Sequence, residues 1–243
     1  MPIKRPHLNL DLSSLQSLSS SVPIQKLSTL EHLRSNFDNL KSQLTGGACP
    51  LFREAPEGYD YPAACRIGSD TLHNGFMVYN AGVDAFVHVC RDEGQCKGAY
   101  DGDKLHISVK RDEMPQAFGV LSKFLFSEDC PIDKWKFVHV SELGSGNRVC
   151  EGAQFTLYVK PDAADSQFTT QALSRLRHFV ERLESEMASQ NIHPGKYPDS
   201  DVRPSHWQFI SYRNEMRSQR EGSEEQSVSL SNEPLYRLLT ELS

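Results

Sequence analysis

The sequence lacks the features that mark several common classes of protein. No apolar run approaches the roughly 20 residues that a helix needs to span a bilayer. The N-terminal stretch MPIKRPHLNLDL is basic but has no continuous apolar core, so we do not expect ordinary signal-peptide export. A net charge of −6 argues against a nucleic-acid binder that works by bulk electrostatics. We therefore expect neither a membrane nor a nucleic acid as partner.

Motifs for metal or thiol chemistry are also missing. The six cysteines form no CxxC pair of the zinc type, and we expect reduced, mostly structural thiols. None of them is followed six positions later by arginine, as a tyrosine-phosphatase loop requires. There is no HExxH motif, no P-loop and no Asp/His series of a two-metal phosphatase. We expect no metal and no cofactor.

The hydrophobic pattern divides the chain into an arm and one domain. Residues 1–27 should form a flexible arm, because the serine-rich stretch 13–21 offers too little apolar surface to fold alone. Residues 28–243 mix helical and strand-like segments without a strict βαβ rhythm, which predicts an α+β fold. We expect a single compact domain whose twisted, mostly antiparallel sheet is packed by helices.

Periodicity and capping signals predict the individual elements. Helices are expected from a capping box at Ser28 to Gly46-Gly47, from Pro115, over 168–190, near 207–220, and at the leucines after 234. Strands are expected at 76–80, 84–90, 104–110, 134–139 and 154–160. The acidic stretch 221–232 should be exposed.

Three of the predicted strands share one two-faced design. Side chains two residues apart lie on the same face of a strand, so each of these strands has an apolar face and a cationic, hydrogen-bonding face. The polar faces hold Lys104, His106, Ser108 and Lys110; Lys134 and Lys136; and Thr156, Tyr158 and Lys160. An ordinary half-buried antiparallel strand gives the same alternation with solvated lysines. The pattern alone leaves a structural and an anion-binding interpretation open.

Arginines extend this group of cations. In the helix predicted near 207–220, Arg213, Arg217 and Arg220 would share one face. They can be solvated surface residues, or they can form a bidentate clamp for phosphate. Arg148, after a turn-like Gly/Ser/Asn stretch, could serve similarly.

A metal-free pocket with lysines, a histidine and arginines suits β-elimination of phosphate. A lysine that is desolvated and crowded by other cations has a depressed pKa, so it can be neutral and remove the weakly acidic Cα proton. A protonated histidine can donate to the oxygen of the leaving phosphate. Phosphate binding without chemistry and metal-free hydrolysis of the phosphoester are the alternatives at this point.

Four segments resemble the phosphothreonine lyases of bacterial type III secretion, the OspF/SpvC family. They are GDKLHISVKRDEMPQAF (102–118), LFSEDCPIDKWK (125–136), GAQFTLYVKPD (152–162) and SDVRPSHWQFISYRNEMRSQREG (200–222). The resemblance implies a virulence effector that is delivered into a host cell, to the cytoplasm and the nucleus. There it would irreversibly inactivate MAP kinases by converting the phosphothreonine of a doubly phosphorylated Thr-x-Tyr loop to dehydrobutyrine. We expect it to act as a monomer.

The resemblance also implies a role for individual residues. Lys136 in DKWK would be the general base, His106 in DKLHIS the general acid, and Lys104 the group that polarises the leaving phosphate. The residues expected to hold the phosphothreonine group are Arg148, Tyr158 and Arg213, and those expected to receive the phosphotyrosine are Lys160 and Arg220. We interpret Lys134 and Arg217 as field-shaping or surface residues.

The arm carries a match to the docking motif that MAP kinases recognise. Lys4 and Arg5 are followed by Leu8 and Leu10, so basic residues could meet an acidic patch while the leucines fill a groove. So short a pattern is weak alone, but the resemblance places a docking motif at this point. A flexible tether would raise the effective concentration of the active site near the activation loop.

Overall fold

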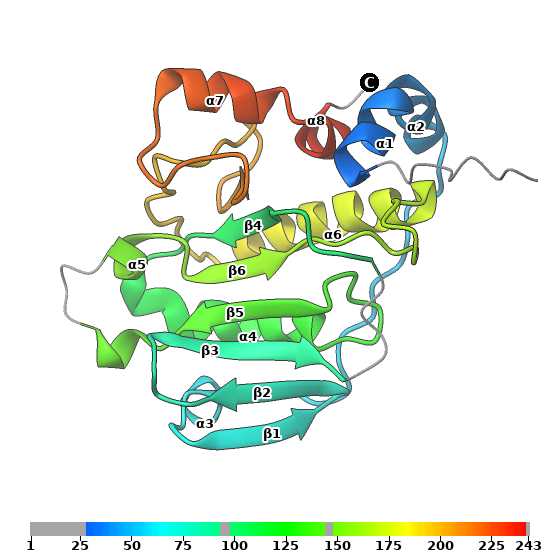
Figure 1. The fold of residues 1–243 in the computed structure, drawn as a ribbon. Coiled ribbons are helices and arrows are strands. Elements are labelled where there is room, and N and C mark those ends of the chain that lie inside the picture. Colours follow the sequence, from blue (N-terminus) through cyan, green and yellow to red (C-terminus); the bar gives the residue numbers. More distant parts are fainter. Residues whose placement is uncertain (1–27, 93–97, 144–147, 242–243) are drawn as a thin grey trace, which may run out of the picture.

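A seven-stranded antiparallel sheet forms the centre of the computed structural model, which describes residues 28–92, 98–143 and 148–241 (Figure 1). The strands are β1 (Ser69–His73), β2 (Phe76–Asn80), β3 (Phe86–Arg91), β4 (Asp103–Ile107), β5 (Lys134–Val138), β6 (Phe155–Tyr158) and β7 (Ile210–Asn214). Their spatial order is β1-β2-β3-β5-β6-β4-β7, and each neighbouring pair is antiparallel. The predicted α+β class and antiparallel sheet are confirmed. The predicted arm, with its docking motif, lies outside the described residues.

The register of the strands aligns apolar side chains into rows on one face of the sheet. One row crosses the whole sheet and consists of Thr71, Val78, Val89, Trp135, Leu157, Leu105 and Tyr212. Its members from Val78 onward are almost completely buried. Burial of such side chains drives folding, so this face must be covered by other elements.

Two helices provide most of that cover. The helices are α1 (Thr29–Ser35), α2 (Phe37–Thr45), α3 (Tyr61–Ala64), α4 (Met114–Leu125), α5 (Arg148–Glu151), α6 (Thr170–Ser189), α7 (Glu224–Ser231) and α8 (Pro234–Thr240). Helices α4 and α6 lie behind the sheet in Figure 1, and each buries one apolar stripe. No helix crosses in front of β5 and β6 in this view. The opposite face is therefore available for a site.

The structure corrects several predicted elements. The capping box at Ser28 is present, but the helix after it is interrupted at Asn36 and forms α1 and α2. The helix predicted near 207–220 is wrong: this segment forms β7 and a turn. The stretch 221–232 is largely exposed as expected, but most of it is helical. The sequence prediction also missed β1.

Strand β7 begins where it does because helix α6 fixes its first residues. The carboxylate of Glu184, in α6, accepts hydrogen bonds from the backbone N–H groups of Gln208, Phe209 and Ile210, at 2.9, 3.0 and 2.7 Å. Unpaired N–H groups at this buried position would be costly, and one carboxylate satisfies three of them. The contact joins two distant parts of the chain. It holds the segment that leads into Ile210, the first residue of β7.

Replacing Glu184 by alanine should destabilise the fold. The loss of acceptors for buried N–H groups should lower the free energy of unfolding by about 2–4 kcal/mol, which corresponds to a fall in melting temperature of roughly 5–10 °C for a chain of this size. Glu181→Ala is the matched control, because Glu181 in the same helix makes only an i,i+4 ion pair with Arg177. It should cost about 0.5 kcal/mol or less. Equal melting temperatures for the two variants would contradict the role given to Glu184.

Candidate active site

A cavity of about 500 Å³ opens on the face of the sheet opposite the helices. Its lining residues come from five strands, from helix α5 and the loop after it, and from the segment after β7. They are Phe86, Lys104, His106, Lys136, Val149, Ala153, Thr156, Tyr158, Arg213, Glu215, Ser218, Gln219 and Arg220. Six of the eight residues for which we predicted catalytic or substrate-binding roles are among them. The cationic faces of the separate strands therefore meet in one place.

Two cross-strand rows run along the floor of the cavity, and all of their members except Lys134 line it. In the first row Thr156 lies between Lys136 on β5 and His106 on β4. The second row crosses β5, β6, β4 and β7 in that order. It consists of Lys134, Tyr158, Lys104 and Arg213. Since neighbouring strands lie about 4.8 Å apart, the backbones of β5 and β4 are separated by roughly 9.5 Å. A small ligand group can sit over Thr156 with Lys136 on one side and His106 on the other.

His106 is fixed in orientation by a buried carboxylate. Its Nδ1 lies 2.6 Å from Oδ2 of Asp201, and the histidine is only 7% exposed. Burial alone would raise the pKa of Asp201, but the charge of His106 and hydrogen bonds from His106, Ser211 and Ser200 hold it below its usual value. With Nδ1–H donating to Asp201, Nε2 is the ring nitrogen left for the cavity.

The loop that carries Asp201 is itself attached to the sheet. Val202 exchanges two backbone hydrogen bonds with Tyr212 of β7, at 2.9 and 2.7 Å. Ser211 donates to Oδ2 of Asp201 at 2.7 Å, and Arg213 donates to Ser200 at 3.1 Å. Strand β7 thus positions both Arg213 and the partner of His106.

Both lysines of the cavity are electrostatically tuned. Burial lowers the pKa of Lys136, and the nearby charge of Lys104 lowers it further. Burial also lowers the pKa of Lys104, while Glu215 acts in the opposite direction. Among the described residues Lys136 has no ion-pair partner, and its ammonium group lies 3.8 Å from the centre of the Phe86 ring. Lys136 is therefore the side chain best suited to lose its proton and act as a base.

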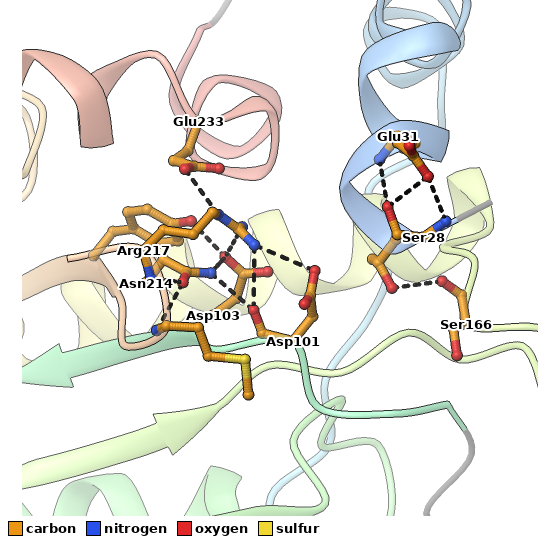
Figure 2. Close-up of polar contacts among 11 residues, drawn as sticks. Ser28, Glu31, Asp101, Asp103, Ser166, Asn214, Arg217 and Glu233 are labelled. Atoms are coloured by element: carbon orange, nitrogen blue, oxygen red, sulfur yellow. Dashed lines mark hydrogen bonds and ion pairs between the residues drawn. The ribbon is translucent and has the colours of Figure 1, made fainter.

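The segment after β7, residues 215–220, is held by a cluster of charges around Arg217 (Figure 2). Arg217 contacts three carboxylates: Glu233 at 2.9 Å, Asp101 at 3.3 Å and Asp103 at 3.6 Å. The side chain of Asn214 accepts hydrogen bonds from two backbone N–H groups of this turn and donates to Asp103. We call this group of five residues the Arg217 cluster.

The cluster corrects two of our predictions about the arginines. Arg217 is not a solvated surface residue: its side chain is 24% exposed, and its guanidinium is paired with Glu233 and Asp101. Nor do Arg213, Arg217 and Arg220 share a helical face: Arg213 is buried in β7, and Arg220 is exposed at the rim of the cavity. The two that line the cavity are there because the Arg217 cluster fixes the turn between them.

Other predicted residues lie apart from the cavity or are only partly described. Lys160 comes after the last residue of β6 and lines a different cavity of about 330 Å³. Lys134 is exposed and does not line the cavity. Arg148 opens helix α5, and its side chain is outside the described part of the structure. The neighbouring Val149 does line the cavity.

Sequence reasoning missed three residues of the site. Asp201 is 95 residues from His106 in the chain, so no local spacing could pair them. Phe86 was visible as an alternating residue of a predicted strand, but nothing indicated that it would face Lys136. Glu215 adjoins the arginines in sequence, but no local pattern indicated that it lines the cavity beside Lys104.

None of the cysteines whose side chains the structure describes lines the cavity. Cys49, Cys65 and Cys130 have free thiols, and burial raises the pKa of Cys65 and of Cys130 to about 12, which makes them unreactive. Within residues 28–92, 98–143 and 148–241, no group of three or more His, Cys, Asp and Glu residues is arranged to hold a metal ion. In the same ranges no helix is both long and apolar enough to cross a membrane.

Comparison with known proteins gives matches over nearly the whole chain. The OspF/SpvC family model matches residues 2–241. The phosphothreonine lyase OspF of Shigella flexneri is 46% identical over 99% of this chain and 100% of its own length. A MAPK phosphothreonine lyase of Salmonella typhimurium is 44% identical with the same coverage.

Solved structures agree with these matches. The Salmonella plasmid virulence C protein (SpvC) superposes with a TM-score of 0.86 and 45% identity, covering 88% of this chain and 100% of that one. The phosphothreonine lyase effector VirA (SpvC) of Chromobacterium violaceum gives 0.85 and 46%, covering 88% and 99%. The fold of this chain is thus shared with proteins of known structure.

Replacing Arg217 by methionine should destabilise the protein, and more strongly at high pH. Removing the cation leaves buried carboxylates unpaired, which should cost about 3–5 kcal/mol. Burial raises the pKa of Asp103 to about 6, while Arg217 holds it down, so without Arg217 the pKa should rise further. A raised carboxyl pKa means stability that is present at low pH and lost as the pH rises through that pKa. The gap between the proteins should therefore widen from pH 5 to pH 8.

Chemical denaturation at several pH values would measure this gap. Arg220→Met is the control, because Arg220 is exposed and its removal should change stability little at any pH. A gap for Arg217→Met that stays constant between pH 5 and pH 8 would argue against the pairing with Asp103.

Proposed function

The chain belongs to the OspF/SpvC family of phosphothreonine lyases, and from this premise we propose that it eliminates phosphate from the activation-loop phosphothreonine of doubly phosphorylated host MAP kinases. One observation carries the assignment of roles: Lys136 and His106 flank Thr156 on the floor of a single cationic cavity. A base on one side and an acid on the other are what a β-elimination needs.

Lys136 would act as the general base. A neutral amine must reach the Cα–H of the phosphothreonine, and burial together with Lys104 favours the neutral form of Lys136. As Lys136 takes the proton, the electron pair of the Cα–H bond forms the Cα=Cβ double bond. The Cβ–O bond breaks, and the threonine becomes dehydrobutyrine. No hydroxyl remains for rephosphorylation, so the inactivation is irreversible.

His106 would assist departure of the phosphate. Its Nδ1 is engaged with Asp201, so Nε2–H of the imidazolium can donate to the bridging oxygen as the Cβ–O bond breaks. The hydrogen bond to Asp201 would hold the ring in the orientation that this step requires. The phosphate leaves with the bridging oxygen and the donated proton.

The remaining cations would bind the phosphate. Lys104 and Arg213 adjoin each other on β4 and β7 and face the same cavity, where Lys104 would polarise the leaving group. Tyr158 can donate through its hydroxyl, and Arg148 would complete the set from the start of α5. Charge-assisted hydrogen bonds from several donors stabilise the phosphate as its negative charge grows. On this basis we propose a reaction that needs no metal ion.

The phosphotyrosine of the same loop would be received beside the cavity. Arg220 lines both the active-site cavity and a neighbouring one of about 460 Å³, so it can contact a group two residues from the phosphothreonine. Lys160, the other residue expected to receive the phosphotyrosine, follows the opposite end of β6 and lines neither of these two cavities, so Arg220 carries this part of the proposal. The same proposal includes docking of the kinase by the arm, through Lys4, Arg5, Leu8 and Leu10. It also includes delivery into the host cell by type III secretion.

Mass spectrometry of a treated phosphopeptide tests the reaction and its base. The wild-type product should be lighter by one water than the threonine peptide that a phosphatase would leave, and EDTA should not reduce its yield. Lys136→Ala should lower kcat by about 10²–10⁴-fold. Lys134→Ala is the matched control, since Lys134 lies on the same strand and face but outside the cavity. A plain threonine product would refute the lyase function, and equal rates for the two variants would refute the base.

Phosphotyrosine should survive treatment of a doubly phosphorylated peptide. Its phosphate is attached to an aromatic ring, so abstraction of the Cα proton cannot expel it. The tyrosine phosphate should be recovered intact, whereas phosphothreonine, with its Cα–H and β-phosphate, is consumed. Loss of phosphate from both residues would indicate a hydrolytic mechanism and contradict elimination.

A further inference from the structure

One carboxylate lines the active-site cavity. Of the described residues around it, Lys104, His106, Lys136, Arg213 and Arg220 bring cationic groups, and Glu215 alone is acidic. An acid in a pocket for a phosphate dianion works against binding. We therefore asked what Glu215 could contribute to the reaction cycle.

Glu215 occupies the position next to the lysine that would bind phosphate. Its Oε2 lies 3.2 Å from Nζ of Lys104 and 3.1 Å from the hydroxyl of Tyr100. The side chain of Lys104 is 13% exposed, whereas that of Glu215 is 49% exposed. The lysine is therefore confined, while the carboxylate has room to turn away towards solvent.

The backbone of Glu215 is firmly held. Its N–H donates to the carbonyl of Gly102 at 2.8 Å, which continues the pairing of β4 with β7. Gly102 has a φ of +89°, and a Cβ there would approach Oδ1 of Asn214 to 2.7 Å. The Arg217 cluster fixes the chain on the other side. The backbone of Glu215 is thus held while its side chain is half exposed, so rotation of that side chain would break or restore the contact with Lys104.

Glu215 is charged at neutral pH. Burial alone would raise the pKa of its carboxyl, but the charge of Lys104, hydrogen bonds from Lys104 and Tyr100, and the charge of Lys136 keep it below its usual value. A phosphate dianion arriving at Lys104 must therefore compete with an existing anion. Both cannot pair with the same ammonium group without strong mutual repulsion.

We propose that Glu215 is a positioning residue that holds Lys104 in the free enzyme, yields it to the substrate phosphate, and takes it back when free phosphate leaves. This inference rests on the proposed function and adds a step to it. In the empty cavity the carboxylate offsets repulsion among the crowded cations and keeps Lys104 in place. After elimination it competes with the inorganic phosphate and favours release.

The same carboxylate acts on the general base. Its charge raises the pKa of Lys136, whereas burial and Lys104 lower it. Asp84, from the loop before β3, also raises this pKa, and Lys134 lowers it. Removal of the charge at residue 215 should therefore shift Lys136 further towards the neutral form. A residue that only supported the fold would not produce this effect.

Binding of inorganic phosphate to the full chain tests the proposal without any turnover. Glu215→Gln keeps the shape of the side chain and removes its charge, so phosphate should bind roughly three- to fivefold more tightly than to the wild type, as expected for one partly exposed charge. Glu225→Gln is the matched control, because it removes one charge from an exposed position on α7. Calorimetric titration at low ionic strength gives the three dissociation constants. Equal or weaker binding by Glu215→Gln would overturn the proposal.

The pH dependence of the reaction supplies a second readout. Activity should rise with pH as Lys136 loses its proton, and in Glu215→Gln this rise should occur at lower pH than in the wild type. Glu215→Asp retains a charge and should lie nearer to the wild type in both the rise and the phosphate affinity. If the activity of Glu215→Gln rises at the same pH as that of the wild type, or at a higher pH, the proposal is contradicted.

The two measurements separate this inference from the function on which it rests. A wild-type protein that forms no dehydrobutyrine would refute the lyase function, whatever the phosphate affinities. Normal product formation with unchanged phosphate affinity in Glu215→Gln would refute the role of Glu215 alone. Melting temperatures of the variants show whether each is folded, and Glu215→Ala, which also removes the charge, takes the place of Glu215→Gln if that variant does not fold.

Discussion

The site depends on the antiparallel register of the sheet. Each of β4, β5, β6 and β7 alternates side chains between the helix-covered core and the open face, and the pairing brings Lys136, Thr156 and His106 into one row. A slip of one residue in β5 would turn Lys136 towards the core and Trp135 into the cavity. The apolar row containing Trp135 prevents this, because its burial strongly favours a single register. The hydrophobic core thus sets the position of the catalytic lysine.

The second constraint is the mutual repulsion of the crowded cations. Buried carboxylates outside the cavity offset part of this repulsion. Asp201 lies behind His106, and Asp103 and Glu233 lie behind the turn that carries Arg220. These acids are buried and directed at particular partners, so they do not compete for ligands in the cavity. The cavity keeps an excess of positive charge, which lowers the pKa of Lys136 and attracts phosphate. Glu215 differs from them because it is half exposed and faces the cavity itself.

Much of this arrangement follows from the sequence, and the exceptions have a common cause. Alternation within 104–110, 134–139 and 154–160 predicted which side chains would share a face, because that information is local. Strand β7 was misread as a helix because Arg213, Arg217 and Arg220 happen to have helical spacing. What makes the segment extended is remote: Glu184 binds its first N–H groups, and Val202 pairs with Tyr212. The pairing of His106 with Asp201 is equally remote, so neither could be read from spacing.

Strand β4 shows how closely stability and chemistry are joined in this protein. Its alternate residues Lys104 and His106 face the cavity, while Asp103, Leu105 and Ile107 face the other way into the protein. Asp103 is therefore one peptide unit from Lys104, yet it belongs to the Arg217 cluster that holds the turn bearing Glu215. The lysine and the carboxylate that contact each other across the cavity are anchored through the same buried acid. The backbones that carry Lys104 and Glu215 are thus held next to each other by the pairing of β4 with β7 and by the Arg217 cluster, which leaves the contact itself to the two side chains.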